Sequence, residues 1–204
     1  DGFVSDIFDL ELPNDADNGI PAADFTRGQA FYDLLLEVDP NNDQTLYAGG
    51  IDLFQSSNGA ELGNPNSWNQ ISKWSNNNNL AGLDVPLVHA DQHAMVFAPN
   101  NSNTILYGND GGVYYNSLAL FDIEPRNNGF ITSQFYTVGV APTDAFAGDT
   151  DYFIGGLQDN GTQLFNGVTP GINSSSTAFG GDGAASFFDQ DGSDQYYITN
   201  FIYN

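Results

Sequence analysis

The sequence contains no cysteine in its 204 residues. Disulfide bonds, thiol catalysis and cysteine-ligated metal sites are therefore excluded. The absence does not argue against secretion, because a large β-domain can bury enough surface to be stable without disulfides.

Positive charge is almost as scarce as cysteine. Arg27, Lys73 and Arg126 are outnumbered by 26 acidic residues, which gives a formal net charge of −23. Nucleic acids and anionic membranes are bound through Lys and Arg side chains, so both are poor partners for this chain. An acidic surface stays soluble in saline, where salt screens its self-repulsion, and we expect a secreted or cell-surface location.

Long apolar runs are also missing from the sequence. None approaches the ~18 residues that a membrane-spanning helix needs, so we expect no membrane insertion. The first residues carry no signal-peptide pattern. The chain opens on Asp1 and stops at Asn204, directly after an apolar run. We therefore expect the sequence to be a piece of a longer chain.

The residues that are present are those of a folded domain. Hydrophobic residues make up 40% of the chain and aromatic residues 14%, which is too much apolar surface for a disordered acidic tail. The 23 glycines and 9 prolines suit many short strands joined by tight turns.

A unit of three strands recurs with a period of roughly 45–60 residues, the range of four-stranded propeller blades. Each copy has an apolar first strand, a turn rich in Asp, Asn or Pro, a second strand and then a third. First strands are predicted at 31–38, 93–98, 134–140 and 183–188, second strands at 45–50, 104–109, 152–156 and 196–199, and third strands at 51–56, 112–117 and 162–165.

These short strands, which lack helical periodicity, predict an all-β fold. We expect a β-propeller of four-stranded antiparallel blades, of which about three and a half are present. Residues 1–27 are expected to be the outer part of a preceding blade, and residues 28–204 to form blades that are incomplete at the C-terminus. The stretches 59–86 and 166–178 are expected to be long loops.

One motif follows the third strand of the first copy. Ser56-Ser57-Asn58-Gly59, with Trp68 after it, resembles a degenerate Asp-box that has Asn for Asp and an insertion before the Trp. Related Gly/Asp-containing segments recur at 28–33, 88–94, 108–114, 155–162 and 180–183.

Together these motifs are similar to BNR/sortilin-like (Vps10-like) β-propellers, which occur in large secreted proteins of environmental bacteria. They are more distantly similar to propeller glycosidases of the xyloglucanase type. The resemblance covers about residues 28–190 and implies the fold. It does not choose between functions, because propellers include both enzymes and binding proteins.

Both histidines of the chain lie in one short segment, His89-Ala90-Asp91-Gln92-His93. If this segment is a strand, His89, Asp91 and His93 share one face. Two imidazoles and a carboxylate are a plausible ligand set for a divalent metal, and a neutral histidine could act as a general base. The alternative is that these side chains hydrogen-bond the loops of a neighbouring blade.

Two aspartates occupy equivalent turns between a second and a third strand. Asp110 lies in Asn-Asp-Gly-Gly and Asp159 in Gln-Asp-Asn-Gly. The resemblance to xyloglucanase-type enzymes implies that such a pair could act as the acid and base of a glycosidase. The alternative is a structural hairpin turn, which favours Asp and Asn before Gly. The separation of the carboxyl groups decides between the two, and it must be roughly 5–10 Å for catalysis.

Further candidates concern binding. Asp182 precedes a first strand much as Asp91 does, so both could bind a cation at one channel mouth, or simply form turns. The spaced carboxylates of 189–194 suit calcium, although this loop aligns with an ordinary hairpin. Trp68 and Trp74 could form a platform that stacks on a sugar, with Trp74 the freer of the two because an Asp-box tryptophan usually packs within its own blade. Gln158 and Asn160 flank Asp159 as candidate ligand-binding residues.

We therefore expect a non-enzymatic extracellular module that binds a glycan or a protein, or that builds a surface assembly with other copies or modules. The alternative is a glycoside hydrolase-like enzyme that uses Asp110 and Asp159. No cofactor is certain from the sequence, and a divalent cation, calcium or zinc, is the candidate.

Overall fold

The structure, a computed structural model, describes residues 10–22, 24–117, 122–129, 133–142, 152–166, 175–191 and 196–202. The predicted all-β class is confirmed: the described residues form fourteen strands and one short 3-10 helix, η1 (Asn78–Gly82). No helix among them is long and apolar enough to cross a membrane. The chain divides into two units, Asp1–Gly129 and Phe130–Asn204, which are described separately.

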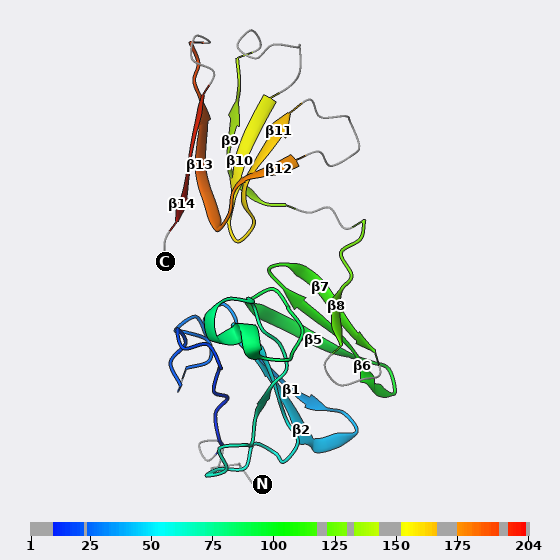
Figure 1. Cartoon of the computed structure of the whole chain (residues 1–204). Helices are drawn as coiled ribbons and strands as arrows, with labels where there is room; N and C mark the ends of the chain where they lie inside the picture. The colour runs from blue at the N-terminus through cyan, green and yellow to red at the C-terminus, as the bar shows by residue number, and fades with distance from the viewer. Residues whose placement is uncertain are drawn as a thin grey trace. The chain divides into compact units, whose positions relative to one another are not determined.

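The first unit contains two four-stranded antiparallel sheets, each with its strands in chain order (Figure 1). Sheet 1 consists of β1 (Leu35–Asp39), β2 (Asn42–Gly49), β3 (Leu53–Ser56) and β4 (Asn69–Gln70). Sheet 2 consists of β5 (Gln92–Ala98), β6 (Asn101–Asn109), β7 (Gly112–Ser117) and β8 (Ile123–Pro125).

The second unit contains a third four-stranded sheet in chain order and a two-stranded sheet. Sheet 3 consists of β9 (Phe135–Val140), β10 (Tyr152–Leu157), β11 (Gly161–Asn166) and β12 (Ser175–Phe179). Sheet 4 pairs β13 (Asp182–Phe188) with β14 (Tyr197–Ile202). The prediction of four-stranded antiparallel meanders followed by a partial one is therefore confirmed, whereas their closure into a propeller is not tested.

The core of the first unit lies between sheets 1 and 2. Strand β1 contacts β5, and alternate residues of both sheets point into the shared interior. The buried cluster consists of Leu35, Tyr47, Leu53, Ile71, Val88, Met95, Ile105, Tyr107, Tyr114 and Ile123. Burial of these side chains, at roughly 1.5–3 kcal/mol for each large apolar one, is the main force that holds the two sheets together.

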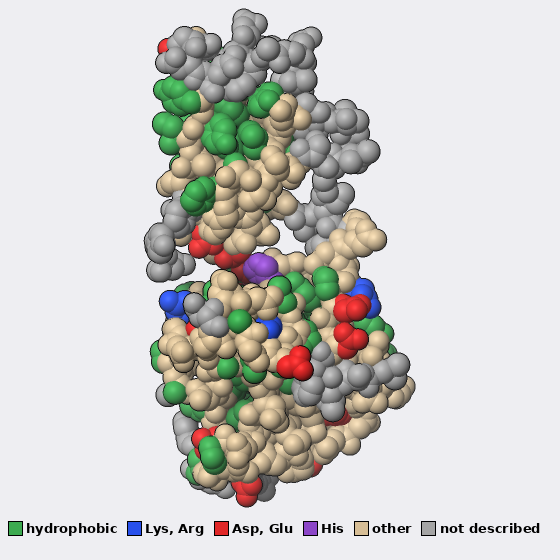
Figure 2. Space-filling model, in the orientation of Figure 1, with side chains coloured by type: hydrophobic (Ala, Val, Ile, Leu, Met, Phe, Trp, Pro, Cys, Tyr) green, Lys and Arg blue, Asp and Glu red, His purple; other side chains and the backbone are tan. Residues whose placement is uncertain are grey.

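The outer face of each sheet is also apolar. On sheet 1, Leu34, Leu36 and Val38 alternate with inward-facing residues and are about half exposed or more. In the second unit, Figure 2 shows hydrophobic side chains gathered on one face. The exposed hydrophobic residues of this unit include Val138, Val140 and Phe187. Each sheet packs one face against the other sheet of its unit, and its opposite face exposes apolar side chains.

Several strand boundaries differ from the prediction. The first strand begins at Leu35 instead of residue 31, because Tyr32 and Asp33 donate their amide N–H groups to the Gln29 carbonyl and form a turn. Four-stranded blades were predicted, but no positions were given for the fourth strands, which are β4, β8 and β12. The predicted 59–86 loop contains β4 and η1. The buried Lys73 ammonium holds η1 in place by donating to the carbonyls of Leu80, within η1, and of Leu83, directly after it.

The motif similar to an Asp-box forms a compact turn at the end of β3. The Ser56 hydroxyl donates to Asn58 Oδ1 (2.9 Å) and accepts the Ala60 N–H (2.9 Å), while Gly59 adopts a φ of 69°. The Trp68 indole N–H donates to the Glu11 carbonyl at 2.7 Å. Trp68 therefore anchors the N-terminal segment to sheet 1. The domain boundary predicted at residue 27 stays a prediction.

Sheets 3 and 4 approach closely through small residues. The Thr137 hydroxyl donates to the Ala184 carbonyl (2.7 Å) and accepts the Ser186 N–H (3.0 Å). A Cβ added at Gly156 would lie 2.0 Å from the Ala184 carbonyl oxygen, whereas one added at Gly108 of sheet 2 would meet only the Ala94 Cβ, at 3.7 Å. The second strand of sheet 3 therefore requires glycine where that of sheet 2 does not.

The substitution Gly156→Ala should destabilise the protein by roughly 1–3 kcal/mol, because the backbone of β13 must shift to admit the methyl group. The matched change Gly108→Ala should leave stability unchanged or raise it by about 0.4–1 kcal/mol, since it only restricts the unfolded chain. Urea unfolding of both variants measures the difference. Equal stability of the two variants would show that sheets 3 and 4 do not pack as described.

Candidate functional site

One end of sheets 1 and 2 collects the polar side chains of three separate segments. They are the 29–33 turn before β1, the 89–91 segment before β5, and the turn between β6 and β7 that contains Asp110. Because β6 runs antiparallel to β5, its end lies beside the start of β5. Strand pairing and the packing of β1 on β5 therefore bring these segments together.

Tyr32, His93 and Asp110 form a hydrogen-bonded triad at this end. The Tyr32 hydroxyl lies 2.9 and 3.0 Å from the two carboxylate oxygens of Asp110. His93 Nε2 lies 2.6 Å from Asp110 Oδ1, and the Tyr32 and His93 rings contact edge to face at 4.8 Å. Both donors converge on Asp110, so its carboxylate is held as an acceptor.

The second ring nitrogen of His93 also has an oxygen atom within hydrogen-bond distance. His93 Nδ1 lies 3.1 Å from the Tyr32 carbonyl oxygen, which can only accept a hydrogen bond. Nε2 meets a carboxylate, which is also an acceptor when it is ionised. Both ring nitrogens of His93 therefore face oxygen atoms of the protein, which favours a hydrogen-bonding role over the metal-ligand role that the sequence suggested.

Asp33 follows Tyr32 in the sequence and is fully buried, with 0% of its surface exposed. Among the described residues, no donor reaches either of its carboxylate oxygens, and its own amide N–H is used by the Gln29 carbonyl at 3.0 Å. Burial, and next the negative charge of Asp91, raise the pKa of Asp33 to about 7. An unpaired buried carboxylate is costly, so this side chain requires a proton or a cation.

Asp91 links Asp33 to the triad. One of its carboxylate oxygens lies within 4.8 Å of one of Asp110. Burial, and then the charge of Asp110, raise the pKa of Asp91. Its backbone φ of 64° is a left-handed conformation that Asp tolerates better than most residues. Asp91 therefore precedes β5 instead of lying within it, and the alternation predicted to align it with His89 and His93 is absent.

Gln92 and His89 lie in the same segment as Asp91 and hydrogen-bond the backbone around it. The fully buried Gln92 amide donates to the carbonyls of His89 (2.6 Å) and Ile51 (3.4 Å) and accepts from Asn109 (3.3 Å). His89 Nδ1 lies 3.2 Å from the Ala90 carbonyl oxygen. A neutral His89 that donates from Nδ1 would keep a lone pair on Nε2 for a metal.

The equivalent end of sheet 3 carries the remaining carboxylate and amide candidates. Asp159 has a φ of 58° and donates its amide N–H to Asp182 Oδ1 at 2.9 Å. The Gln158 side chain accepts from the Tyr136 hydroxyl, and Asn160 Nδ2 donates to the Gln158 carbonyl at 3.1 Å. These residues therefore form a bonded turn within the second unit. Asp110 belongs to the other unit, so their pairing as acid and base stays a prediction.

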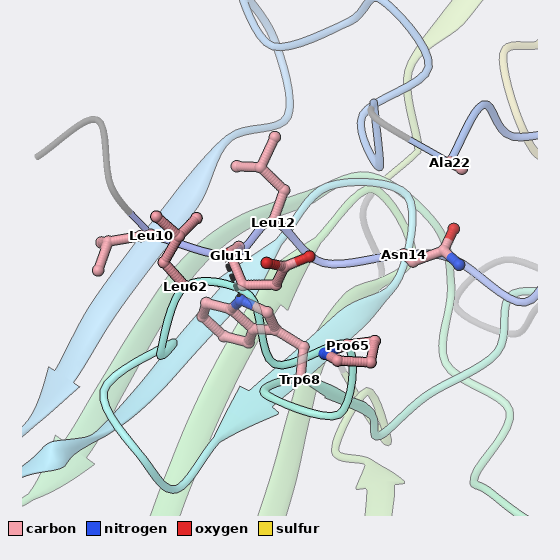
Figure 3. Close-up of a pocket in the computed structure, with 8 residues that line it drawn as sticks. All are labelled: Leu10, Glu11, Leu12, Asn14, Ala22, Leu62, Pro65 and Trp68. Carbon is pink, nitrogen blue, oxygen red and sulfur yellow. Dashed lines mark hydrogen bonds between the residues drawn. The ribbon is translucent and has the colours of Figure 1, made fainter.

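The two tryptophans differ in their surroundings. Trp74 is 41% exposed, and its indole N–H donates to Asp17 Oδ2 at 3.0 Å. Trp68 lines a pocket with Leu10, Glu11, Leu12, Asn14, Ala22, Leu62 and Pro65 (Figure 3). The turn that leads to Trp68 follows the end of β3, whereas Asp33 directly precedes the start of β1. Because the starts of β1 and β3 lie at the same end of sheet 1, this pocket is at the opposite end of the sheet from Asp33.

Sequence reasoning found the segment 89–93 and Asp110 but missed Tyr32 and Asp33. The sequence did hold a signal for them. Tyr32 and Asp33 are an aromatic and an acidic residue at the start of the first strand of one repeat, and the 89–93 segment occupies the same position in the next repeat. The calcium loop predicted at 189–194 lies partly outside the described residues, which end at 191 and resume at 196.

Comparison of the chain with protein-family models and with curated proteins gave no match.

Sheet 1 has its own aspartate in the turn between its second and third strands. Asp52 is fully buried, and it accepts from the Ser72 hydroxyl at 2.8 Å and from Gln70 Nε2 at 3.1 Å. Burial, and then the charge of Asp15, raise its pKa from 3.8 to about 7. Aspartate thus occurs in this turn in all three four-stranded sheets, as Asp52, Asp110 and Asp159.

The pKa of Asp52 predicts that stability depends on pH. Between 3.8 and about 7 the folded chain keeps a proton that the unfolded chain has lost. The free energy of unfolding therefore falls as the pH rises through this window. The variant Asp52→Asn should match the original protein at about pH 5 and be more stable than it at about pH 8 in urea unfolding, because the amide needs no proton.

The exposed Asp84 provides the control. Asp84→Asn should keep the pH dependence of the original protein, because this side chain is in solvent. If Asp52→Asn behaved like Asp84→Asn at both pH values, burial of an ionisable Asp52 would be ruled out.

Proposed function

We propose that the chain is a non-enzymatic extracellular module that binds polysaccharide at the end of sheets 1 and 2 where Tyr32, His93 and Asp110 meet. The observation that carries the proposal is Phe31, which is 90% exposed and directly precedes this triad in the sequence. A fully exposed phenylalanine beside a group of carboxylates is a combination suited to sugars. The aromatic ring stacks on the apolar face of a sugar, and carboxylate oxygens accept from its hydroxyl groups.

The proposal includes the β-propeller predicted from the sequence repeats. Four-stranded antiparallel meanders with two apolar faces need a sheet on each side, and the radial arrangement of a propeller supplies one. The packing of β1 on β5, and of β9 and β10 on β13, supports blade-on-blade stacking within each unit. In propellers the turns between second and third strands gather at one end, which makes that end the natural ligand site.

Charge narrows the class of polysaccharide. With a net charge of −23, the chain repels uronate-rich or sulfated polymers, so the proposed ligand is a neutral polysaccharide. A location outside the cell follows from this ligand and from the acidic composition. Extracellular protein partners remain a weaker proposal, since the exposed aromatic residue and carboxylates favour sugar.

The hydrogen bonds of Asp110 support binding over hydrolysis. A glycosidase needs one carboxyl group that donates a proton to the leaving oxygen. Asp110 is hydrogen-bonded to both Tyr32 and His93. Because these bonds direct its oxygens toward protein groups, Asp110 is poorly placed to donate to a substrate, and the enzymatic alternative would rest on Asp159 for that role.

Binding of neutral oligosaccharides, with xyloglucan among them, tests the proposal. Phe31→Ala should weaken binding about fivefold to tenfold, because a stacking contact contributes about 0.5–1.5 kcal/mol. Calorimetric titration with the best glycan from an array gives the affinity, and an anionic glycan such as alginate should not bind. Product analysis of the same mixtures should detect no hydrolysis.

Two variants locate the site. Leu62→Ala changes the pocket beside Trp68, and Trp74→Ala removes the other exposed aromatic candidate, so both should bind as the original protein does. Loss of binding in Leu62→Ala with normal binding in Phe31→Ala would move the sugar site to the opposite end of sheet 1. Hydrolysis that disappears in Asp110→Asn would establish the enzymatic alternative instead.

A further inference from the structure

The sequence contains five Asn-Gly pairs, whose asparagines are Asn18, Asn58, Asn128, Asn160 and Asn166. The two residues of such a pair can react with each other, because glycine has no Cβ to hinder the approach of its amide nitrogen to the asparagine side chain. Hydrogen bonds to other groups keep the two apart. The surroundings of each pair in the fold therefore decide which one reacts.

The pair Asn128-Gly129 lies in an exposed turn after β8. No described residue makes a hydrogen bond with the Asn128 side chain or with the Gly129 N–H. Gly129 has a φ of 80°, and no atom of a described residue lies within 4 Å of where its Cβ would be. Both reacting groups are therefore in solvent, with space around them.

The pair Asn58-Gly59 is held by the turn at the end of β3. Asn58 Oδ1 accepts from the Ser56 hydroxyl at 2.9 Å, and Asn58 Nδ2 donates to the Ser67 hydroxyl at 3.3 Å. The Gly59 N–H donates to the Gln44 carbonyl at 2.8 Å. Reaction at this pair requires these hydrogen bonds to break first, which slows it.

Two further pairs are held in part. The Gly19 N–H donates to Asp17 Oδ1 at 2.8 Å. Asn160 Nδ2 donates to the Gln158 carbonyl at 3.1 Å. Gly167, of the last pair, lies outside the described residues. Among the pairs that the structure describes in full, the one at position 128 is therefore the most open to reaction.

We propose that Asn128 is a site of spontaneous deamidation through attack by the Gly129 nitrogen. This nitrogen forms a bond to Asn128 Cγ, the Cγ–Nδ2 bond breaks, and the side-chain nitrogen leaves as ammonia with the proton of the Gly129 N–H. The product is a cyclic succinimide. Water then opens the ring at either carbonyl and leaves aspartate or isoaspartate at position 128, with no oxidation or reduction.

The position of the pair gives the reaction structural consequences. Gly129 is the last residue of the first unit, so isoaspartate at position 128 would redirect the main chain at the boundary between the units. The preceding Asn127 holds the β6–β7 turn, since its Oδ1 accepts the Val113 N–H (2.8 Å) and its Nδ2 donates to the Gly111 carbonyl (2.9 Å). The reaction therefore adds a negative charge directly after the residue that fixes the turn of Asp110.

The experiment incubates the folded protein at mildly alkaline pH, where the amide nitrogen loses its proton more readily, and follows each asparagine by peptide mapping with mass spectrometry. No sugar is present, so the result is independent of glycan binding. Asn128 should deamidate at least about tenfold faster than Asn58, because several hydrogen bonds oppose the reaction at Asn58. In guanidinium chloride the two should react at similar rates, because both precede glycine and neither is held.

Asn128→Gln is the matched variant, because it keeps an exposed amide that must close a larger and less favourable ring. It should lose the reaction at position 128, while Asn58 and Asn160 behave as in the original protein. Circular dichroism before incubation checks that the variant is folded, and the comparison of Asn128 with Asn58 within the original protein needs no variant. Equal rates at these two residues in the folded protein, or aspartate without isoaspartate at position 128, would overturn the proposal.

Discussion

The buried amide of Gln92 is the contact on which the candidate site depends. Its side chain joins the Ile51 carbonyl of sheet 1, the His89 carbonyl before β5 and the Asn109 amide at the end of β6. Its backbone N–H adds a fourth bond, to the Gly50 carbonyl at 2.9 Å. Sheet packing alone would allow the two sheets to slide, whereas these directional bonds set their register. The positions of His93 and Asp110 follow from that register.

The strands that the sequence predicts best are those with an alternating pattern and clear turns. The third strand at 112–117 matches β7 at both ends, since Gly112 and the preceding turn mark its start. The fourth strands were missed because β4 and β8 have only two and three residues, and β12 is largely Ser and Thr. The predicted start at Phe31 was wrong because an apolar run continues into a turn, where hydrogen bonds to Gln29 override the pattern.

The site was predictable in its residue types but not in its geometry. The cluster of His89, Asp91 and His93 stands out in sequence because the chain has only two histidines. Tyr32, which contacts His93, lies 61 residues before it in the sequence. No local sequence pattern predicts a contact between residues so far apart in the chain. The left-handed backbone conformation of Asp91 also cannot be predicted from the sequence. It removes the strand alternation that would have placed His89, Asp91 and His93 on one face. The structure therefore pairs His93 with Tyr32 and Asp110, contacts that the 89–93 segment alone does not reveal.

The central claim is that the polar end of sheets 1 and 2 is a ligand site and not only a joint between sheets. A crystal soaked with the neutral oligosaccharide that binds best tests this claim most directly. The account predicts sugar density stacked on the exposed Phe31 ring, with sugar hydroxyl groups within hydrogen-bond distance of the Asp110 carboxylate. Sugar bound only in the pocket beside Trp68, or no sugar at this end of the two sheets, would contradict it.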